Sequence, residues 1–225
     1  MQSSDTVMDE TETITEEQTA ANTWSPPLPN CIVLASMGMV MDARVMAVFR
    51  TLQELNHRMS ACWARGELLD AITFQDLTDW ASSRLLSLRG ALVDDIESEC
   101  LRLGLLCFMT LSSLQLLEPR RGQAHLSGYA YLAHNFRTAL LAVDLASHQL
   151  STLMLWLLTV GAMTVFDVDQ EEHWLVKKWL EAAQALPGVL LSWEAATEQL
   201  ESVIWMKRLH DDAGFKVYKK LISKT

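Results

Sequence analysis

Three carboxylates lie close together near the middle of the chain, at a spacing that could hold a divalent metal ion. Asp94 and Asp95 precede Glu99 by about one helical turn, and paired carboxylates of this kind can hold magnesium against a diphosphate. A further acid would be expected at position 98, which is Ser98, and a second metal motif beginning at Asp144 lacks its closing Glu. We therefore interpret the acidic run as a solvated start of a helix. A helical, magnesium-dependent enzyme for terpenoid-type substrates is the alternative function.

The histidines and cysteines have none of the spacings typical of metal or catalytic sites. The chain has no H-E-x-x-H, C-x2-C, G-x-S-x-G, phosphate-loop or dinucleotide-binding pattern. Cys100 and Cys107 share one helix face, and we expect both in the core as small hydrophobes. We predict no catalytic, cofactor-binding or metal-binding residue, and histidines that are exposed or hydrogen-bonded. The remaining residues of these types are Cys31, Cys62, His57, His125, His134, His148, His173 and His210.

Tryptophans crowd the last third of the chain. Such a cluster could line an apolar ligand cavity between helices, and Trp156 and Trp193 are the candidate lining residues for a small-molecule effector. The favoured interpretation is core packing, because tryptophan supplies a large buried area wherever helices meet. The five residues are Trp156, Trp174, Trp179, Trp193 and Trp205.

The formal charge of −10 over 225 residues is unevenly distributed. Residues 1–20 hold six of the 28 acids and no Lys or Arg, so 22 acids face 18 bases in the rest, a net charge of −4. We predict a disordered acidic tail and Pro-rich linker over residues 1–27, since this stretch has few large apolar residues to bury, and one helical domain over 28–225. Direct nucleic-acid binding by this chain is not expected, because binding to phosphates requires a surface rich in Lys and Arg.

Hydrophobic periodicity over the rest of the chain predicts helix after helix. Apolar steps of three and four residues recur, Gly66, Gly90, Pro119 and Pro187 mark ends, and Ser192 is an expected N-cap. We predict an all-α fold, a compact array of about seven to eight helices. The expected helical segments are 45–62, 77–88, 94–114, 131–143, 145–166, 167–186 and one that begins after Ser192, and Lys216, Lys219, Lys220 and Lys224 mark a solvated helix end.

Residues 145–166 form an uncharged segment of 22 residues, long enough to span a bilayer. It contains several polar residues, and a charged periodic segment follows it at once. We therefore expect a buried central helix, with Gly161 allowing close helix packing, and no membrane association. A membrane-anchored helical protein is a further alternative.

Residues 99–108 (ECLRLGLLCF) and residues 155–162 (LWLLTVGA) are two apolar helical segments with distinctive residue patterns. They resemble the E-C-x-R-L helix and the L-W-L-L-x-x-G-A segment of the regulatory (middle homology) domain of fungal-specific transcription factors. The order that follows also matches: Glu172-His173-Trp174-Leu175 opens a helix, and Ser192-Trp193-Glu194-Ala195 and Val203-Ile204-Trp205 come after it. The resemblance covers roughly residues 30–210.

The resemblance implies a non-enzymatic, all-α domain that regulates transcription in the nucleus. In that family the domain follows a zinc binuclear-cluster DNA-binding domain, whose six cysteines begin C-x2-C-x6-C, and this chain has no such run. The implied partners are therefore coregulators, a second copy of the chain or a small-molecule effector. DNA reading would come from another domain or from a partner chain. The resemblance transfers no catalytic residue and no cofactor.

Overall fold

The computed structural model describes residues 41–67, 70–117, 129–143 and 148–224. Within these ranges the chain forms eight helices and no strand, which confirms the all-α prediction. The predicted tail over 1–27, together with Cys31, His125 and Asp144, lies outside the described residues. The helices are α2 (Ala43–Ala64), α3 (Ala71–Ser87), α4 (Ile96–Leu117), α5 (Ala130–Ala142), α6 (His148–Thr164), α7 (Glu172–Gln184), α8 (Trp193–Val203) and α9 (Lys207–Ile222).

Short polar side chains cap the N-termini of several of these helices. Ser192 Oγ accepts a hydrogen bond of 3.1 Å from the Ala195 amide, as the N-cap prediction requires. Asp95 Oδ1 accepts one of 3.0 Å from the Ser98 amide at the start of α4. Gly66 and Gly90 follow α2 and α3 with φ of 73° and 78°, a left-handed conformation that glycine adopts without steric cost.

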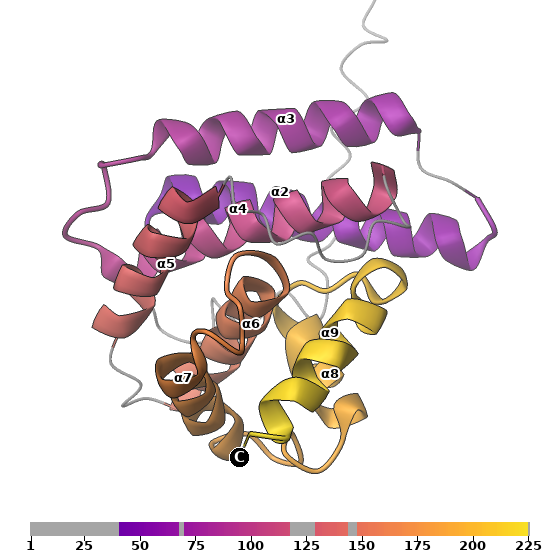
Figure 1. Cartoon of the computed structure of the whole chain (residues 1–225). Coiled ribbons are helices and arrows are strands. Elements are labelled where there is room, and N and C mark those ends of the chain that lie inside the picture. Colours follow the sequence, from indigo (N-terminus) through magenta and orange to yellow (C-terminus); the bar gives the residue numbers. More distant parts are fainter. Residues whose placement is uncertain (1–40, 68–69, 118–128, 144–147, 225) are drawn as a thin grey trace, which may run out of the picture.

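Helix α6 occupies the centre of the array, and α4, α7, α8 and α9 pack around it (Figure 1). Every side chain from Leu150 to Met163 is buried, so the prediction of a buried central helix is confirmed. Across the described ranges, no helix combines the length and apolar character needed to cross a membrane. Gly161 allows close packing, because a Cβ there would lie 2.5 Å from the Phe166 ring and 3.1 Å from the Phe136 ring.

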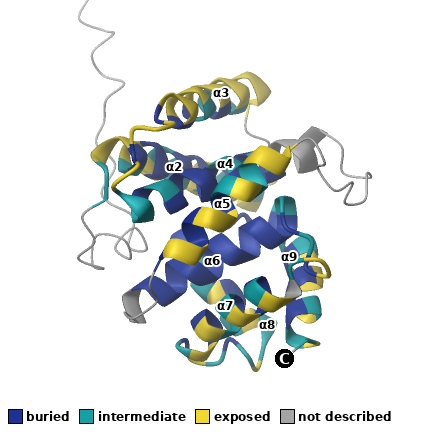
Figure 2. Cartoon of the chain, turned by 60° about the vertical axis from the view of Figure 1, so that its left-hand side comes forward, coloured by how far each residue is buried: buried dark blue, intermediate teal, exposed yellow. Residues whose placement is uncertain are grey.

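The remaining helices α2, α3 and α5 pack on α4. Helices α2 and α4 pack against each other, and α3 lies across both of them with a largely exposed outer face (Figure 2). Helix α5 packs against α4. The N-termini of α2 and α4 are joined, because the Asp42 amide donates a 2.8 Å hydrogen bond to the buried Ser98 Oγ.

Three helix boundaries differ clearly from the prediction. Helix α3 begins at Ala71, six residues before the predicted start at residue 77, because Asp70 caps it by accepting a 2.9 Å hydrogen bond from the Thr73 amide. Helix α7 begins at Glu172, not Asp167, because Asp167 Oδ1 accepts a 3.0 Å hydrogen bond from the Asp169 amide and holds residues 167–171 in turns. The last helical region is divided, since α8 ends at Val203 and α9 begins at Lys207. The backbone at Ile204 is extended, and the Ile204 carbonyl accepts a hydrogen bond from the Trp156 side chain of α6.

Candidate functional site: a buried network of aromatic rings and histidine

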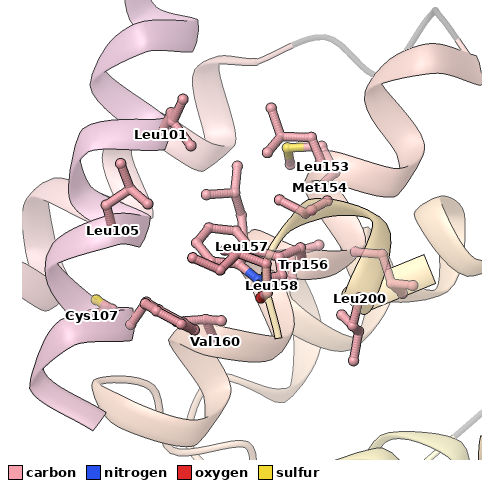
Figure 3. Packing of buried hydrophobic residues seen from close by; sticks show 14 of the residues in the cluster. Leu101, Leu105, Cys107, Leu153, Met154, Trp156, Leu157, Leu158, Val160 and Leu200 are labelled. Atoms are coloured by element: carbon pink, nitrogen blue, oxygen red, sulfur yellow. Dashed lines mark hydrogen bonds between the residues drawn. The ribbon is translucent and has the colours of Figure 1, made fainter. Parts of the chain in front are cut away.

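Trp156, one of the two candidate cavity residues, is fully buried in the centre of the array. Its Nε1 donates a 2.6 Å hydrogen bond to the Ile204 carbonyl in the segment between α8 and α9. Its ring lies 5.9 Å from the Phe108 ring of α4. Figure 3 shows Leu105 and Cys107 on the α4 face that approaches Trp156 and Leu157 of α6. Trp156 therefore connects α4, α6 and the α8–α9 segment.

Trp193, the other candidate, begins α8 and is half-buried in a second aromatic cluster. Its ring lies 6.2 Å from Trp205, 5.5 Å from Tyr218 and 5.9 Å from Phe215. Gly214 of α9 makes room for this packing, since a Cβ there would lie 2.7 Å from Trp205 and 2.8 Å from Trp193. Trp193 thus packs directly on the backbone of α9.

The two tryptophans belong to one continuous row of rings. The row runs from Trp193 to Trp205, then to His210, whose ring lies 5.0 Å from Trp205, then to Phe108 at 4.9 Å from His210, and on to Trp156. A groove of about 410 Å³ lies elsewhere, over residues 183–188 and 190–191 at the end of α7. Neither tryptophan lines it. The ligand cavity at Trp156 and Trp193 stays a prediction.

His210 is the polar member of the row and is fully buried. The Met206 amide donates a 3.2 Å hydrogen bond to its Nδ1, so the neutral imidazole carries its proton on Nε2. Nε2 lies 3.2 Å from Ser112 Oγ and donates to it, and Ser112 in turn donates to the Phe108 carbonyl at 2.9 Å. All polar atoms of the pair are therefore hydrogen-bonded.

The Ser112–His210 pair has the residue types of a nucleophile and its base, but the opposite proton arrangement. A base that activates serine must accept the hydroxyl proton, whereas Nε2 of His210 donates and the Ser112 hydroxyl is used by Phe108. Both side chains are buried, with exposures of 2% for Ser112 and 0% for His210. The pair is a polar bridge between α4 and α9.

Burial lowers the pKa of His210 to about 3, and this predicts acid-dependent stability. Below the unfolded-state pKa of about 6.5, His210 binds a proton in the unfolded chain but remains neutral in the folded chain. Stability should therefore fall as pH drops from about 6.5 towards 3, by roughly 1 kcal/mol per pH unit from this group alone. Urea unfolding at pH 7, 6, 5 and 4 measures the slope.

The slope is assigned to one residue by a matched pair of variants. His210→Asn removes the titrating ring and should reduce the pH slope below 6.5, whatever its effect on stability at pH 7. His57 is exposed on α2, and His57→Asn is the control for the same substitution at a surface histidine. Equal slopes for wild type and His210→Asn would contradict the prediction.

Of the three carboxylates near the start of α4, Asp94 is exposed, and Asp95 and Glu99 make structural contacts. Asp95 caps the helix, and both oxygens of Glu99 accept hydrogen bonds of 2.6 Å from Arg102. Arg102 is 4% exposed, and its Nη1 also donates a 3.0 Å bond to the Leu85 carbonyl at the end of α3. Across the residues that the structure describes, no three His, Cys, Asp or Glu side chains group together as a metal site would require.

The other predicted residues are placed as follows. Cys100 and Cys107 are buried as expected, and burial raises the pKa of each thiol to about 12. Lys220 and Lys224 at the end of α9 form ion pairs with Asp169, at 2.6 and 3.4 Å. The described histidines other than His210 that have placed side chains are exposed, namely His57, His134 and His173.

The roles of Arg102 and of Ser112 with His210 were not predicted from the sequence. A signal for Arg102 was present, because it is the single charged residue in the apolar run from Cys100 to Leu117. A charge at such a position is expected to be paired. Ser112 and His210 carried no comparable signal, since they are 98 residues apart.

Comparison with protein-family models, with curated proteins and with solved structures found no match to this chain.

Proposed function

We propose that this chain is a non-enzymatic regulatory domain of the fungal-specific transcription factor type. It acts in the nucleus through protein partners, with a small-molecule effector as one form of input, and it relies on another domain or chain to read DNA. The proposal rests on how several of the resembling segments contact one another and on the sequence resemblance of residues 99–108, 155–162, 172–175, 192–195 and 203–205.

The observation that carries the proposal is that three of the resembling segments pack on each other, namely residues 99–108, 155–162 and 203–205. Gly104 of the first segment leaves room for the second, because a Cβ there would overlap the Leu157 side chain and lie 3.1 Å from Trp156. Phe108 contacts Trp156, and Trp156 donates its hydrogen bond to Ile204 of the third segment. Segments that resemble one family in the same order and that pack into one core support the proposal of a shared domain.

A reporter experiment tests the regulatory role. The full chain is fused to a heterologous DNA-binding domain in a fungal cell that carries a matching reporter gene. Reporter expression should differ several-fold from that given by the DNA-binding domain alone. Unchanged expression at equal fusion abundance would overturn the proposal.

Two variants show whether the folded domain is responsible for the reporter effect. Arg102→Met removes a buried charge and disrupts the core, so it should abolish the effect. Arg58 is more than half exposed and pairs with Glu54 on the surface of α2, so Arg58→Met removes the same charge and should leave the effect intact. An effect that survives in both variants would come from outside the helical core.

The isolated chain should not bind DNA specifically. Its formal charge of −10 repels the DNA phosphates. Counterion release drives protein–DNA association only where Lys and Arg side chains neutralise phosphates. A mobility-shift assay at physiological salt should show no specific complex at micromolar protein. A specific complex at micromolar or lower concentration would contradict this part of the proposal.

A further inference from the structure

Helix α3 is attached to the rest of the array through a narrow apolar stripe. Its buried residues are Thr78, Ala81 and Leu85, and Phe74 and Leu77 pack half-buried against the core. These five positions lie on one face of the helix. Most of the remaining surface of α3 is exposed (Figure 2), whereas the central helix α6 is buried on all sides over most of its length.

The stripe buries little apolar surface, and most of that surface lies towards the C-terminal end of α3. None of residues 71–77, which the structure describes in full, is buried. Ala81 contributes a single methyl group, and the Thr78 hydroxyl donates its hydrogen bonds within its own helix. Leu85 is a large side chain with an exposure of 0%. Because the free energy of packing scales with the apolar area removed from water, α3 is held more weakly than α6.

Polar contacts to other helices also gather at the C-terminal end of α3. Arg102 Nη1 of α4 donates its 3.0 Å hydrogen bond to the Leu85 carbonyl in the last turn. Arg89, in the connection to α4, donates a 2.7 Å hydrogen bond to Tyr131 Oη of α5, and its guanidinium lies 4.6 Å from the centre of the Tyr131 ring. The attachment is therefore strongest beside the connection to α4.

We propose that α3 is a strap over α2 and α4 that opens as a unit, pivoting on its connection to α4, while the rest of the array stays folded. Opening breaks the Arg102–Leu85 hydrogen bond and keeps the Arg89–Tyr131 contact, which holds the pivot against α5. Regions with few buried apolar contacts open at a lower free energy than the whole domain unfolds. This difference is the physical basis of the strap.

Opening uncovers apolar surface that the closed array hides. It exposes the inner stripe of α3 together with the surfaces of α2 and α4 on which this helix packs. The equilibrium between closed and open molecules then controls access to this surface. The strap does not depend on the regulatory role proposed above, and neither test decides the other.

Native-state hydrogen exchange of the full chain, measured amide by amide at low urea concentrations, tests the strap. A detached helix of 17 residues is marginal in water, so opening leaves the α3 amides free to exchange. Amides 75–87 should share one protection factor, about 100-fold below that of α6. Their exchange should also depend less on urea, because opening exposes less surface than global unfolding does.

Two patterns of exchange would overturn the proposal. Equal protection and equal urea dependence in α3 and α6 would show that α3 opens only when the whole array unfolds. Protection that decreases gradually towards residue 71, with no urea dependence, would show fraying of the helix end in place of opening as a unit.

A matched pair of variants separates opening of α3 from global unfolding. Leu85→Ala weakens the closed state and should speed exchange in both α3 and α6. Val217 is buried on α9, and Val217→Ala should speed exchange in α6 about tenfold through global unfolding and leave α3 unchanged. Circular dichroism shows that each variant is folded. An equal acceleration of α3 and α6 in Val217→Ala would refute the strap.

Discussion

Replacing Trp156 with Ala should lower the free energy of unfolding by about 5 kcal/mol. Truncating a buried tryptophan costs about 3–5 kcal/mol, and the Ile204 carbonyl also loses its donor, which adds about 1–3 kcal/mol. The total approaches the whole stability of many domains, so the variant should be largely unfolded at 25 °C. Urea unfolding followed by circular dichroism measures the change.

Two other variants separate the contributions to this loss. Trp156→Phe keeps much of the ring and loses the hydrogen bond, so it should cost about 2 kcal/mol. Trp80 is 39% exposed on α3, and Trp80→Ala should lower the free energy of unfolding by less than about 1 kcal/mol. Equal losses at positions 156 and 80 would show that Trp156 does not hold α4, α6 and the α8–α9 segment together.

Replacing Arg102 with Met should lower the free energy of unfolding by about 3–5 kcal/mol. The substitution leaves Glu99 without its charged partner. It also removes the Arg102 donor from the Leu85 carbonyl, which then keeps the longer, 3.3 Å hydrogen bond from the Leu88 amide. Because Leu85 belongs to the last turn of α3, amide hydrogen exchange should become faster at the end of α3 as well as in α4. Urea unfolding and hydrogen exchange together test both effects.

The chain contains a matched exposed pair as a control. Arg58 pairs with Glu54 one turn away on α2 at 2.8 Å, with both side chains accessible to solvent. Arg58→Met should therefore cost only about 0.3–0.5 kcal/mol. The double variant Glu99→Gln with Arg102→Met should be more stable than the sum of the single losses, because it leaves no unpaired charge. Similar losses at positions 102 and 58 would refute a buried pair.

Much of this fold could be predicted from local patterns. The Ser192 cap and the Gly66 and Gly90 helix ends depend on neighbouring residues, and all three are found where they were expected. The burial of α6 followed from the absence of charges over residues 145–166. Helix formation, capping and burial of an apolar face depend on residues a few positions apart, so the order of the sequence is sufficient to predict them.

The contacts that join distant helices appeared only in the folded chain. Ser112 meets His210, Arg102 meets Leu85, and Trp156 bonds to Ile204. The last contact satisfies a carbonyl in the non-helical segment that separates α8 from α9, a break the periodicity did not predict. Which side chains meet across the core depends on how the helices are docked, because a small change in docking brings different residues into hydrogen-bonding distance, and no pattern within one helix determines it.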